Sequence, residues 1–220
     1  MSGDVPPACV AAAPAAVTDL LGLAKSPSGT FESPDWQIRA VHGRSAPQVT
    51  VHDSADLKFL RISGQSRAAF IVRSLAQPVA PHGRLEWIQR IPLSPAGADM
   101  RHAVTDDSPL RLFVVFHAGG FFARTRRVLF YSNGRAEPVS WSAPSAVSRD
   151  LHVIRISTAG NESDWTAISV EPAADYVRTW GGNTPCIVAF GVMQDTDQTH
   201  SAAIAELHHL IWRSHVPSVP

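Results

Sequence analysis

The sequence is poor in lysine, in net charge and in long apolar runs. Lys25 and Lys58 are the lysines among 19 basic residues, and these are balanced by 19 acidic ones. A chain without net charge has no overall field that attracts nucleic acid or an anionic membrane, so we predict no nucleic-acid partner. No apolar run reaches about 18 residues, the length of a membrane-spanning helix, so we predict no membrane span.

Cysteine is equally scarce, with Cys9 and Cys186 the two present. Two residues are too few for a disulfide framework or a cysteine-based zinc site, and we predict that they are not joined. The N-terminal segment lacks the basic start of a secretion signal and is interrupted by Pro6, Pro7 and Pro14. We therefore predict a cytoplasmic location, or a periplasmic one if the true start lies upstream.

Helical periodicity is nearly absent from the body of the chain. Short apolar or alternating runs recur instead, separated by segments rich in Gly, Pro, Ser, Asn and Asp. These runs cover residues 36–42, 48–53, 57–63, 68–75, 84–91, 111–118, 127–133, 151–157, 166–172, 186–194 and 205–212. The pattern predicts an all-β fold, an antiparallel two-sheet jelly-roll sandwich.

One or two short helices accompany the predicted strands. Residues 171–182 show helical spacing, with Ala174, Val177 and Trp180 expected to share a face. A second short helix is expected over residues 15–23. Both would lie outside the two sheets.

The length of 220 residues and the 45% hydrophobic content suffice for one sizeable core. We therefore predict a single sandwich domain over residues 29–213. An N-terminal tail, residues 1–28, would contain the short helix, and residues 214–220 would form a C-terminal tail.

Two acidic pairs stand at predicted strand ends. Asp106 and Asp107 precede a strand that carries Arg111, while Asp195 and Asp197 follow the strand over residues 186–194. Residues i and i+2 of an extended chain point the same way, so these carboxylates are expected at one rim of the sandwich. They could edge a ligand groove, form turns and a buried ion network with Arg111, or bind calcium at Asp195 and Asp197. We predict no resident cofactor or metal, with calcium as the alternative.

The strand over residues 186–194 is expected to present small side chains beside the acidic rim. Strict alternation places Ile187, Ala189 and Gly191 on the same side as Asp195. Small side chains leave room either for an opposing bulky residue from the second sheet or for a ligand in a concave groove.

Recognisable catalytic motifs are missing. No GxSxG elbow accompanies the sequence HAGG at residues 117–120, and no phosphate-binding glycine loop occurs. The adjacent His208 and His209 should face opposite sides of a strand and so cannot bind one metal ion by themselves. Whether the protein is an enzyme therefore stays open. A cofactor-independent cyclase or isomerase that uses the sandwich cavity, with His117 or an aspartate moving a proton, is one alternative to a binding module. A purely structural domain is the other.

Aromatic residues complete the expected binding site. Trp141, in the polar context PVSWSAPS near Tyr131, is the tryptophan most expected to be exposed. A ring beside carboxylates and an arginine can stack on the flat face of a sugar while polar groups bind its edge. We predict a groove for a carbohydrate or another small-molecule ligand, lined by Asp106, Asp107, Arg111, His117, Tyr131, Trp141, Asp195 and Asp197.

The order of these features resembles a bacterial family of β-sandwich proteins of unknown function. The resemblance covers about residues 30 to 213 and is carried by Trp36, Trp87, DDSPLR at Asp106 to Arg111, the pair Arg149 and Asp150, the pair Asp175 and Tyr176, and DTDQT at residues 195–199. It implies a jelly roll similar to carbohydrate-binding modules, in a family that is usually secreted, with no established activity. The chain departs from the family pattern at Gln89, Ser132 and Asn133, near positions where tryptophan is common, and it lacks the usual secretion signal.

Overall fold

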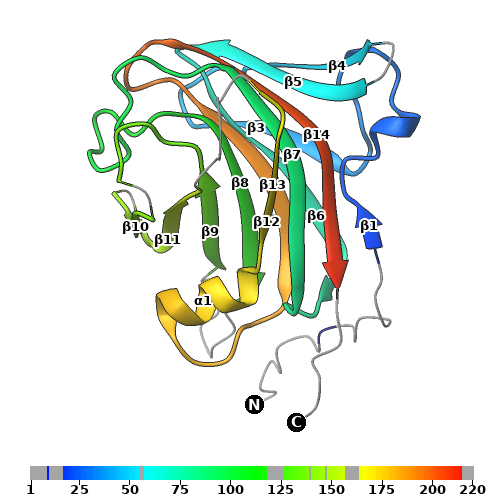
Figure 1. The fold of residues 1–220 in the computed structure, drawn as a ribbon, viewed down its shortest axis with the longest axis vertical. Helices are drawn as coiled ribbons and strands as arrows, with labels where there is room; N and C mark the ends of the chain where they lie inside the picture. The colour runs from blue at the N-terminus through cyan, green and yellow to red at the C-terminus, as the bar shows by residue number, and fades with distance from the viewer. Residues whose placement is uncertain are drawn as a thin grey trace.

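The computed structural model describes Cys9 and residues 17–54, 57–117, 126–138, 140–146, 148–156 and 164–214. Two β-sheets pack face to face and form the predicted all-β jelly-roll sandwich (Figure 1). The first sheet contains, in spatial order, β12 (Thr166–Val170), β7 (Gly83–Leu93), β14 (Ala202–Ser214), β5 (Leu57–Gln65), β4 (Gln48–Ser54) and β2 (Gly29–Thr30), with β1 (Val17–Asp19) beside β14. The second contains β10 (Ser142–Ser145), β11 (Ser148–Arg155), β9 (Arg126–Ser132), β8 (Ser108–His117), β13 (Ile187–Asp195), β6 (Ala68–Val79) and β3 (Trp36–Ala40).

All of the strands predicted from alternation are confirmed. The additional strands β1, β2 and β10 have two to four residues each, too few for a periodic pattern to show in the sequence. The sheets are antiparallel as predicted, with one exception among the described strands: β9 and β11 pair in parallel. Between them in the sequence lies β10, which runs antiparallel to β11, so β11 runs in the same direction as β9.

Alternation along the strands builds the main core between the sheets. In β8, Leu112, Val114 and Phe116 point inward and are fully buried, while Phe113 and Val115 belong to a second apolar cluster on the outer side. Because both faces of β8 are covered, this strand is central in its sheet, as its doubly apolar sequence indicates.

The predicted N-terminal helix is wrong over its described residues. Residues Val17–Asp19 form β1, which pairs with β14, and a single 3-10 turn follows at Leu23–Lys25. Leu20 and Leu21 are 1% and 3% exposed, and the Trp36 indole donates a hydrogen bond to the Leu20 carbonyl at 2.9 Å. Residues 17–25 are therefore part of the sandwich, and the predicted tail boundary at residue 28 lies too late. A short apolar run does not distinguish a helix from an edge strand.

The helix α1 (Pro172–Trp180) is confirmed, but the three residues expected to share a face differ in burial: Ala174 and Trp180 are partly buried and Val177 is exposed. Pro172, Asp175 and Tyr176 are buried, whereas Val177 is 48% exposed. A polar contact decides the orientation, because Asp175 accepts a hydrogen bond of 2.7 Å from the buried Tyr131 hydroxyl. The spacing of hydrophobic residues in the sequence could not predict this hydrogen bond. Within the described part of the chain, no helix is long and apolar enough to cross a membrane.

The two cysteines are joined, contrary to the prediction. Cys9 and Cys186 form a disulfide with their Cα atoms 5.5 Å apart, although 177 positions separate them in the sequence. A Cα distance of about 5.5–6 Å is the usual one for a disulfide. The N-terminal segment is therefore tied to the start of β13, and distance along the sequence was a poor guide to distance in space.

Two β-bulges overturn predictions of side-chain direction. The pairing of β13 shifts between Ile187 and Ala189, so Ile187 joins the main core while Ala189 joins the outer cluster. The pairing of β14 with β7 shifts between His208 and Leu210, and His209 has a positive φ of 55°. The ring centroids of His208 and His209 therefore lie 3.8 Å apart. The bulge adds one residue and so cancels alternation locally.

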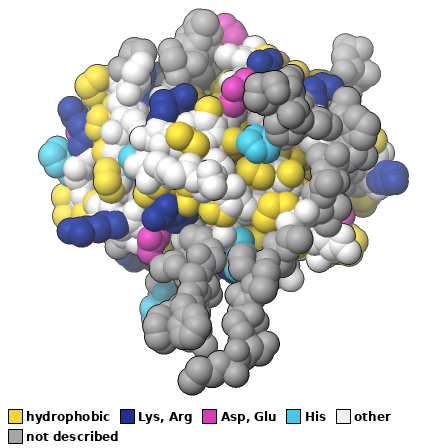
Figure 2. Space-filling view, turned by 90° about the horizontal axis from the view of Figure 1, so that it is seen from below, with side chains coloured by type: hydrophobic (Ala, Val, Ile, Leu, Met, Phe, Trp, Pro, Cys, Tyr) yellow, Lys and Arg dark blue, Asp and Glu magenta, His cyan; other side chains and the backbone are white. Residues whose placement is uncertain are grey.

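Charge is mixed on the end of the molecule that carries α1. Seen from below, basic and acidic side chains lie scattered among apolar ones (Figure 2). This distribution agrees with the neutral composition of the chain.

Candidate functional site

Five of the eight predicted site residues meet at one end of the sandwich. β8 and β13 are antiparallel neighbours with Ser108 opposite Asp195, so the start of one strand lies beside the end of the other. We call Asp106, Asp107, Arg111, Asp195 and Asp197 the acidic cluster. It lies at the end of β13 that points away from α1 (Figure 1).

Arg111 is bound within the acidic cluster by two aspartates. Its guanidinium donates to Asp106 Oδ1 at 2.6 Å and to the Asp106 carbonyl at 3.0 Å. On the other side, Arg111 Nη1 lies 3.9 Å from Asp195 Oδ2. All three residues are less than 10% exposed, so water screens these charges little.

Asp107 connects the two sequence motifs directly. It accepts hydrogen bonds from the Gln198 and Thr199 amides at 3.2 and 2.8 Å, and from the Thr199 hydroxyl at 2.5 Å. The Asp197 Oδ2 atom lies 2.6 Å from the Arg44 Nε atom. The segment DDSPLR therefore holds the turn of DTDQT in place, which explains why both motifs occur in one chain.

Burial and mutual repulsion shape the charges of the acidic cluster. Burial is the largest cause that raises the pKa of Asp195 to about 7, and the nearby carboxylates of Asp197, Asp107 and Asp106 raise it further against the opposing effect of Arg111. Burial also raises the pKa of Asp106, since it outweighs the contact with Arg111. Asp106 and Asp195 therefore keep their protons to a higher pH than free aspartates do.

The buried contact between Arg111 and Asp195 favours the structural interpretation of the acidic cluster. A groove for a sugar needs side chains that the ligand can reach, and the carboxylates of Asp106, Asp107, Asp195 and Asp197 are all buried. Their positions fix the ends of β8 and β13. Removing one partner of such a network leaves the other charges buried without compensation.

The other three predicted site residues lie elsewhere. His117 ends β8, at the far end of the strand from Arg111. Tyr131 is fully buried in the main core, where its ring contacts Trp87. Trp141 is partly buried and packs against the outer cluster of the second sheet. The structure therefore does not bring these three together with the acidic cluster.

A bulky side chain fills the room beside the small residues of β13. A Cβ atom placed on Gly191 would come within 2.0 to 2.5 Å of the Phe113 ring. Phe113 in turn makes edge-on contacts with Phe70 and Phe130, with centroids 5.9 and 5.6 Å apart. A bulky residue therefore occupies the room at Gly191, but it comes from the neighbouring strand β8 of the same sheet and not, as expected, from the opposite sheet.

The departures from the family pattern form a buried polar network. The Trp87 indole donates to Gln89 Oε1 at 2.7 Å, and Gln89 Nε2 donates to Asn133 Oδ1, also at 2.7 Å. Ser132 and Ser108 share a hydrogen bond of 2.8 Å. Since Gln89 and Asn133 are 1% and 5% exposed, these residues link the two sheets inside the sandwich and do not line a surface groove.

A hollow of about 490 Å³ lies beside α1. Tyr131, Ile154, Ile156 and Val170 contribute apolar surface, and Arg84, Glu171, Asp175 and Arg178 contribute charges. Burial, the charge of Asp175 and the hydrogen bond to it raise the pKa of Tyr131 well above 10, so this hydroxyl stays protonated. The enzyme hypothesis requires an apolar cavity with one titratable group, and four ionic side chains around this hollow do not match it.

The sequence interpretation missed a second polar and aromatic surface, on the outer face of the first sheet. His52 stacks on Phe59 with ring centroids 5.3 Å apart and planes within 9°. Trp165 meets Phe59 edge-on at 5.6 Å and His208 at 6.2 Å. We call His52, Phe59, Trp165 and His208 the aromatic row. His52 on β4 pairs with Phe59 on β5, His208 lies on β14, and Trp165 directly precedes β12.

A charged row runs beside the aromatic row. Glu206, with no exposed surface, accepts two hydrogen bonds from Arg61 at 2.8 and 2.6 Å and another from Arg90. Arg90 also lies 4.8 Å from the centre of the Trp165 ring. The carboxylate is thus a fixed anchor that holds two guanidinium groups against the rings.

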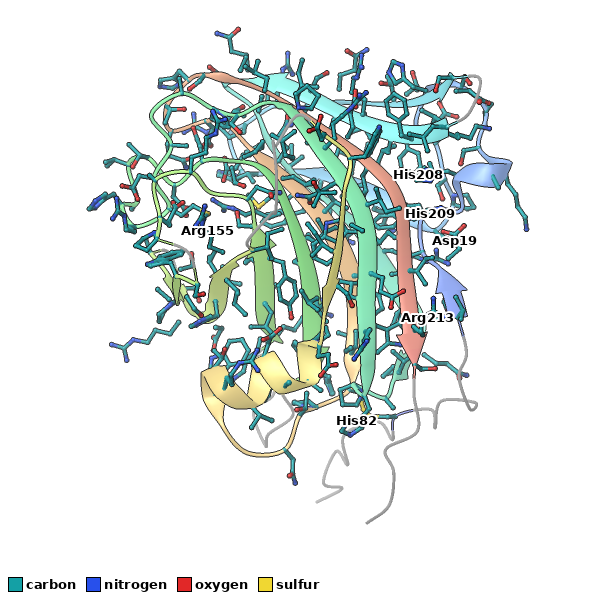
Figure 3. All side chains as sticks on the ribbon, in the orientation of Figure 1. Asp19, His82, Arg155, His208, His209 and Arg213 are labelled. Atoms are coloured by element: carbon teal, nitrogen blue, oxygen red, sulfur yellow. A yellow bond between two sulfur atoms is a disulfide. The ribbon has the colours of Figure 1, made fainter. Side chains whose placement is uncertain are left out.

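A hollow of about 520 Å³ opens next to both rows. Its lining includes the side chains of Gln48, Thr50, His52, Asp53, Arg61 and Ser63. The surface consists of outward-facing residues from several strands. Which of these residues are neighbours follows from the strand register, which the sequence alone does not give. A nearby smaller hollow of about 150 Å³ is lined by Asp19, His208 and His209, which lie beside one another between β14 and β1 (Figure 3).

The chain was compared with known proteins. A family model described as protein of unknown function (DUF3047) matches residues 34–211, more than half of the chain. The chain belongs to this family. A search of curated proteins finds no significant match.

Similar sandwiches occur among solved structures. The xyloglucanase domain of NopAA from Sinorhizobium fredii, in complex with cellobiose, is 9% identical with a TM-score of 0.46, over 86% of this chain and 99% of that one. The family 11 carbohydrate-binding module from Clostridium thermocellum is 9% identical with a TM-score of 0.44, over 88% and 99%. The family 11 xylanase from Neocallimastix patriciarum is 8% identical with a TM-score of 0.46, over 91% and 100%. The likeness concerns the fold alone.

Proposed function

We propose that this member of the DUF3047 family binds a carbohydrate on the outer face of its first sheet, at the aromatic row and the hollow beside it. The observation that carries the proposal is the parallel arrangement of the aromatic row and the charged row across neighbouring strands. A pyranose has flat faces of C–H groups and an edge of hydroxyls. The partly exposed rings of His52 and Trp165, which pack on the buried Phe59, would support the first, and Arg, Gln, Thr and Ser side chains would bind the second.

The charged row supports the proposal because its donors are held in place before any ligand arrives. Arg61 is bound by the buried Glu206, yet its side chain remains 38% exposed. His52 is positioned by a hydrogen bond of 2.9 Å between its Nε2 atom and the Thr50 hydroxyl. Side chains that are ordered in advance lose less conformational entropy on binding, so more of the interaction energy appears as affinity.

The size of the hollow also supports a small ligand. A volume of about 520 Å³ lies within the range of about 300–1,000 Å³ typical of ligand sites. This location differs from the groove predicted at the acidic cluster, where the side chains are buried. The carbohydrate ligand class is the one predicted from the sequence, whereas the residues that bind it are new.

The proposal is tested by calorimetry and affinity electrophoresis of the full chain against soluble glycans. The panel contains cellobiose, mixed-linked β-glucan, xylan, xyloglucan and galactotriose. Trp165→Ala removes a ring of the aromatic row that also contacts Arg90 in the charged row. We expect this change to weaken glycan binding about tenfold or more, since stacking and cation–π contacts at such rings contribute about 1–2 kcal/mol.

Trp141→Ala is the matched control, because it removes a partly buried tryptophan from the outer face of the other sheet. It should leave the affinity for the glycan unchanged. Loss of binding in Trp141→Ala with retention in Trp165→Ala would move the site to the second sheet. No binding of any glycan by the wild type would remove the proposal altogether.

We propose further that the protein matures in an oxidising compartment, which is the periplasmic alternative rather than the cytoplasmic one. The disulfide between Cys9 and Cys186 supports this proposal, because disulfides persist outside the reducing cytoplasm. Alkylation of protein taken directly from its native cells, followed by mass spectrometry, should find both cysteines protected. Two alkylated thiols would show that the protein resides in a reducing compartment.

A further inference from the structure

The acidic cluster combines four carboxylates with Arg111, and Arg44 lies beside it as a second arginine. Asp106 and Asp197 each have an arginine nitrogen at 2.6 Å, from Arg111 and Arg44 respectively. Asp195 shares Arg111 at the longer distance of 3.9 Å. Asp107 is bound by the amides and the hydroxyl of the DTDQT turn, which are neutral donors. With every carboxylate ionised, the formal charge is two negative units in excess.

Buried oxygen atoms without partners lie within the same cluster. The Oδ1 atoms of Asp195 and Asp197 are shielded from solvent and have no hydrogen-bond donor, while their side chains are 8% and 4% exposed. Gln198 Oε1 is a third buried oxygen without a donor in the same segment. A charged oxygen that is buried without a partner is destabilising, so native proteins provide a donor or a cation for it.

The spacing of the carboxylates fits one particular class of cation. One ligand atom from each of Asp107, Asp195 and Asp197 lies within 4.8 Å of the other two. Two Ca²⁺–oxygen bonds of about 2.3–2.6 Å span at most about 4.6–5.2 Å, so the three oxygens are close enough to share one ion. Three protein carboxylates favour Ca²⁺, because Mg²⁺ is usually held by one or two carboxylates and keeps several waters. Carboxylate and amide oxygens are the ligands that such hard cations prefer.

We propose that Asp107, Asp195 and Asp197 bind one divalent cation, and that this cation is Ca²⁺. It would neutralise the two excess negative charges and give the orphaned Oδ1 atoms a partner. The Gln198 amide oxygen, backbone carbonyls and water are available for the remaining positions. Since the ligands come from the start of β8 and from the end of β13, the cation would fasten this end of the sandwich.

The test uses the full chain with its disulfide intact, stripped of metal with EDTA and dialysed. Calorimetric titration with CaCl₂ should show one site per chain, and MgCl₂ should bind at least tenfold more weakly. At a hundredfold excess of free Ca²⁺ over its Kd, the melting temperature should rise by about 5–10 °C. A wild-type protein that takes up no Ca²⁺ at millimolar concentration, or prefers Mg²⁺, overturns the proposal.

Asp197→Asn tests the assigned ligands, because it keeps the size of the side chain and removes its charge. We expect Ca²⁺ affinity to fall at least tenfold. Asp175→Asn is the matched control: Asp175 is also buried and paired with arginine, but it lies in α1 at the other end of the sandwich. It should bind Ca²⁺ as the wild type does. If Asp197→Asn does not fold, Asp107→Asn takes its place, and equal Ca²⁺ affinity in the ligand variant and the control would refute the assignment.

Discussion

Replacing Gln89 by leucine gives the most direct test of the buried polar network. In the wild type, Gln89 accepts a hydrogen bond from the Trp87 indole and donates one to Asn133, both at 2.7 Å. Leucine has a similar volume but can do neither. The substitution therefore leaves two polar groups unpaired, one on each sheet, in residues that are 1% and 5% exposed.

The expected loss of stability follows from these two groups. A buried donor or acceptor without a partner costs about 1–3 kcal/mol, so two such groups cost about 2–6 kcal/mol. The greater hydrophobicity of leucine offsets part of this cost, by about 1 kcal/mol. We expect the free energy of unfolding to fall by about 1–5 kcal/mol, and the melting temperature to fall by roughly 2–20 °C for a chain of this size.

Urea unfolding followed by tryptophan fluorescence measures this change. Gln65→Leu is the matched control, since Gln65 lies at the exposed end of β5 and should change the stability by no more than about 0.5 kcal/mol. In a double-mutant cycle, Gln89→Leu and Asn133→Leu should be clearly non-additive because they share a hydrogen bond. A loss in Gln89→Leu as small as that in the control, or full additivity in the cycle, would refute the reasoning.

Three other predictions concern single sites. Gly191→Ala should lower stability by about 1–3 kcal/mol in thermal unfolding, because its Cβ overlaps the Phe113 ring, and Phe113→Leu should reverse part of the loss; no rescue would contradict that contact. The pKa of Tyr131 is raised in the folded protein, which favours the neutral hydroxyl there. The contribution of this shift to the free energy of unfolding is therefore complete below pH 10 and is lost as the pH rises through the pKa of Tyr131 in the folded state. Urea unfolding between pH 9 and 11 should therefore show a steeper decline for the wild type than for Tyr131→Phe, and equal slopes would count against this origin. Cys186→Ser should lower the free energy of unfolding by about 2–4 kcal/mol, as should reduction of the wild type by dithiothreitol, and an unchanged midpoint would show that the disulfide adds no stability.

The fold was predictable because its signals are local. Alternation within segments such as residues 111–118 follows from the side-chain geometry of an extended chain, whatever that chain later contacts. The same rule predicted that the carboxylates near residues 106 and 195 share a rim, and they do meet. The prediction failed where geometry changes within one residue, as at the bulges beside Ile187 and His209.

The candidate site was less predictable because burial and partners depend on which strands become neighbours. The sequence predicted Asp107 at an exposed rim, but the turn of residues 195–199 covers its carboxylate and donates hydrogen bonds to it. Trp165 follows the polar residues NESD in the sequence, but polarity alone does not place it beside Phe59. That contact depends on the pairing of β12 with β7 and on the order of the first sheet.

From the amino-acid sequence alone come the strands, the sandwich class and the balance of charge, because each depends on the composition or on the period of side-chain direction. The tertiary structure alone decided that Arg111 is enclosed by aspartates, that Cys9 reaches Cys186, and that rings from separate strands form one row. These features join residues that are distant in the sequence, and their proximity depends on strand order and register, which no local pattern encodes.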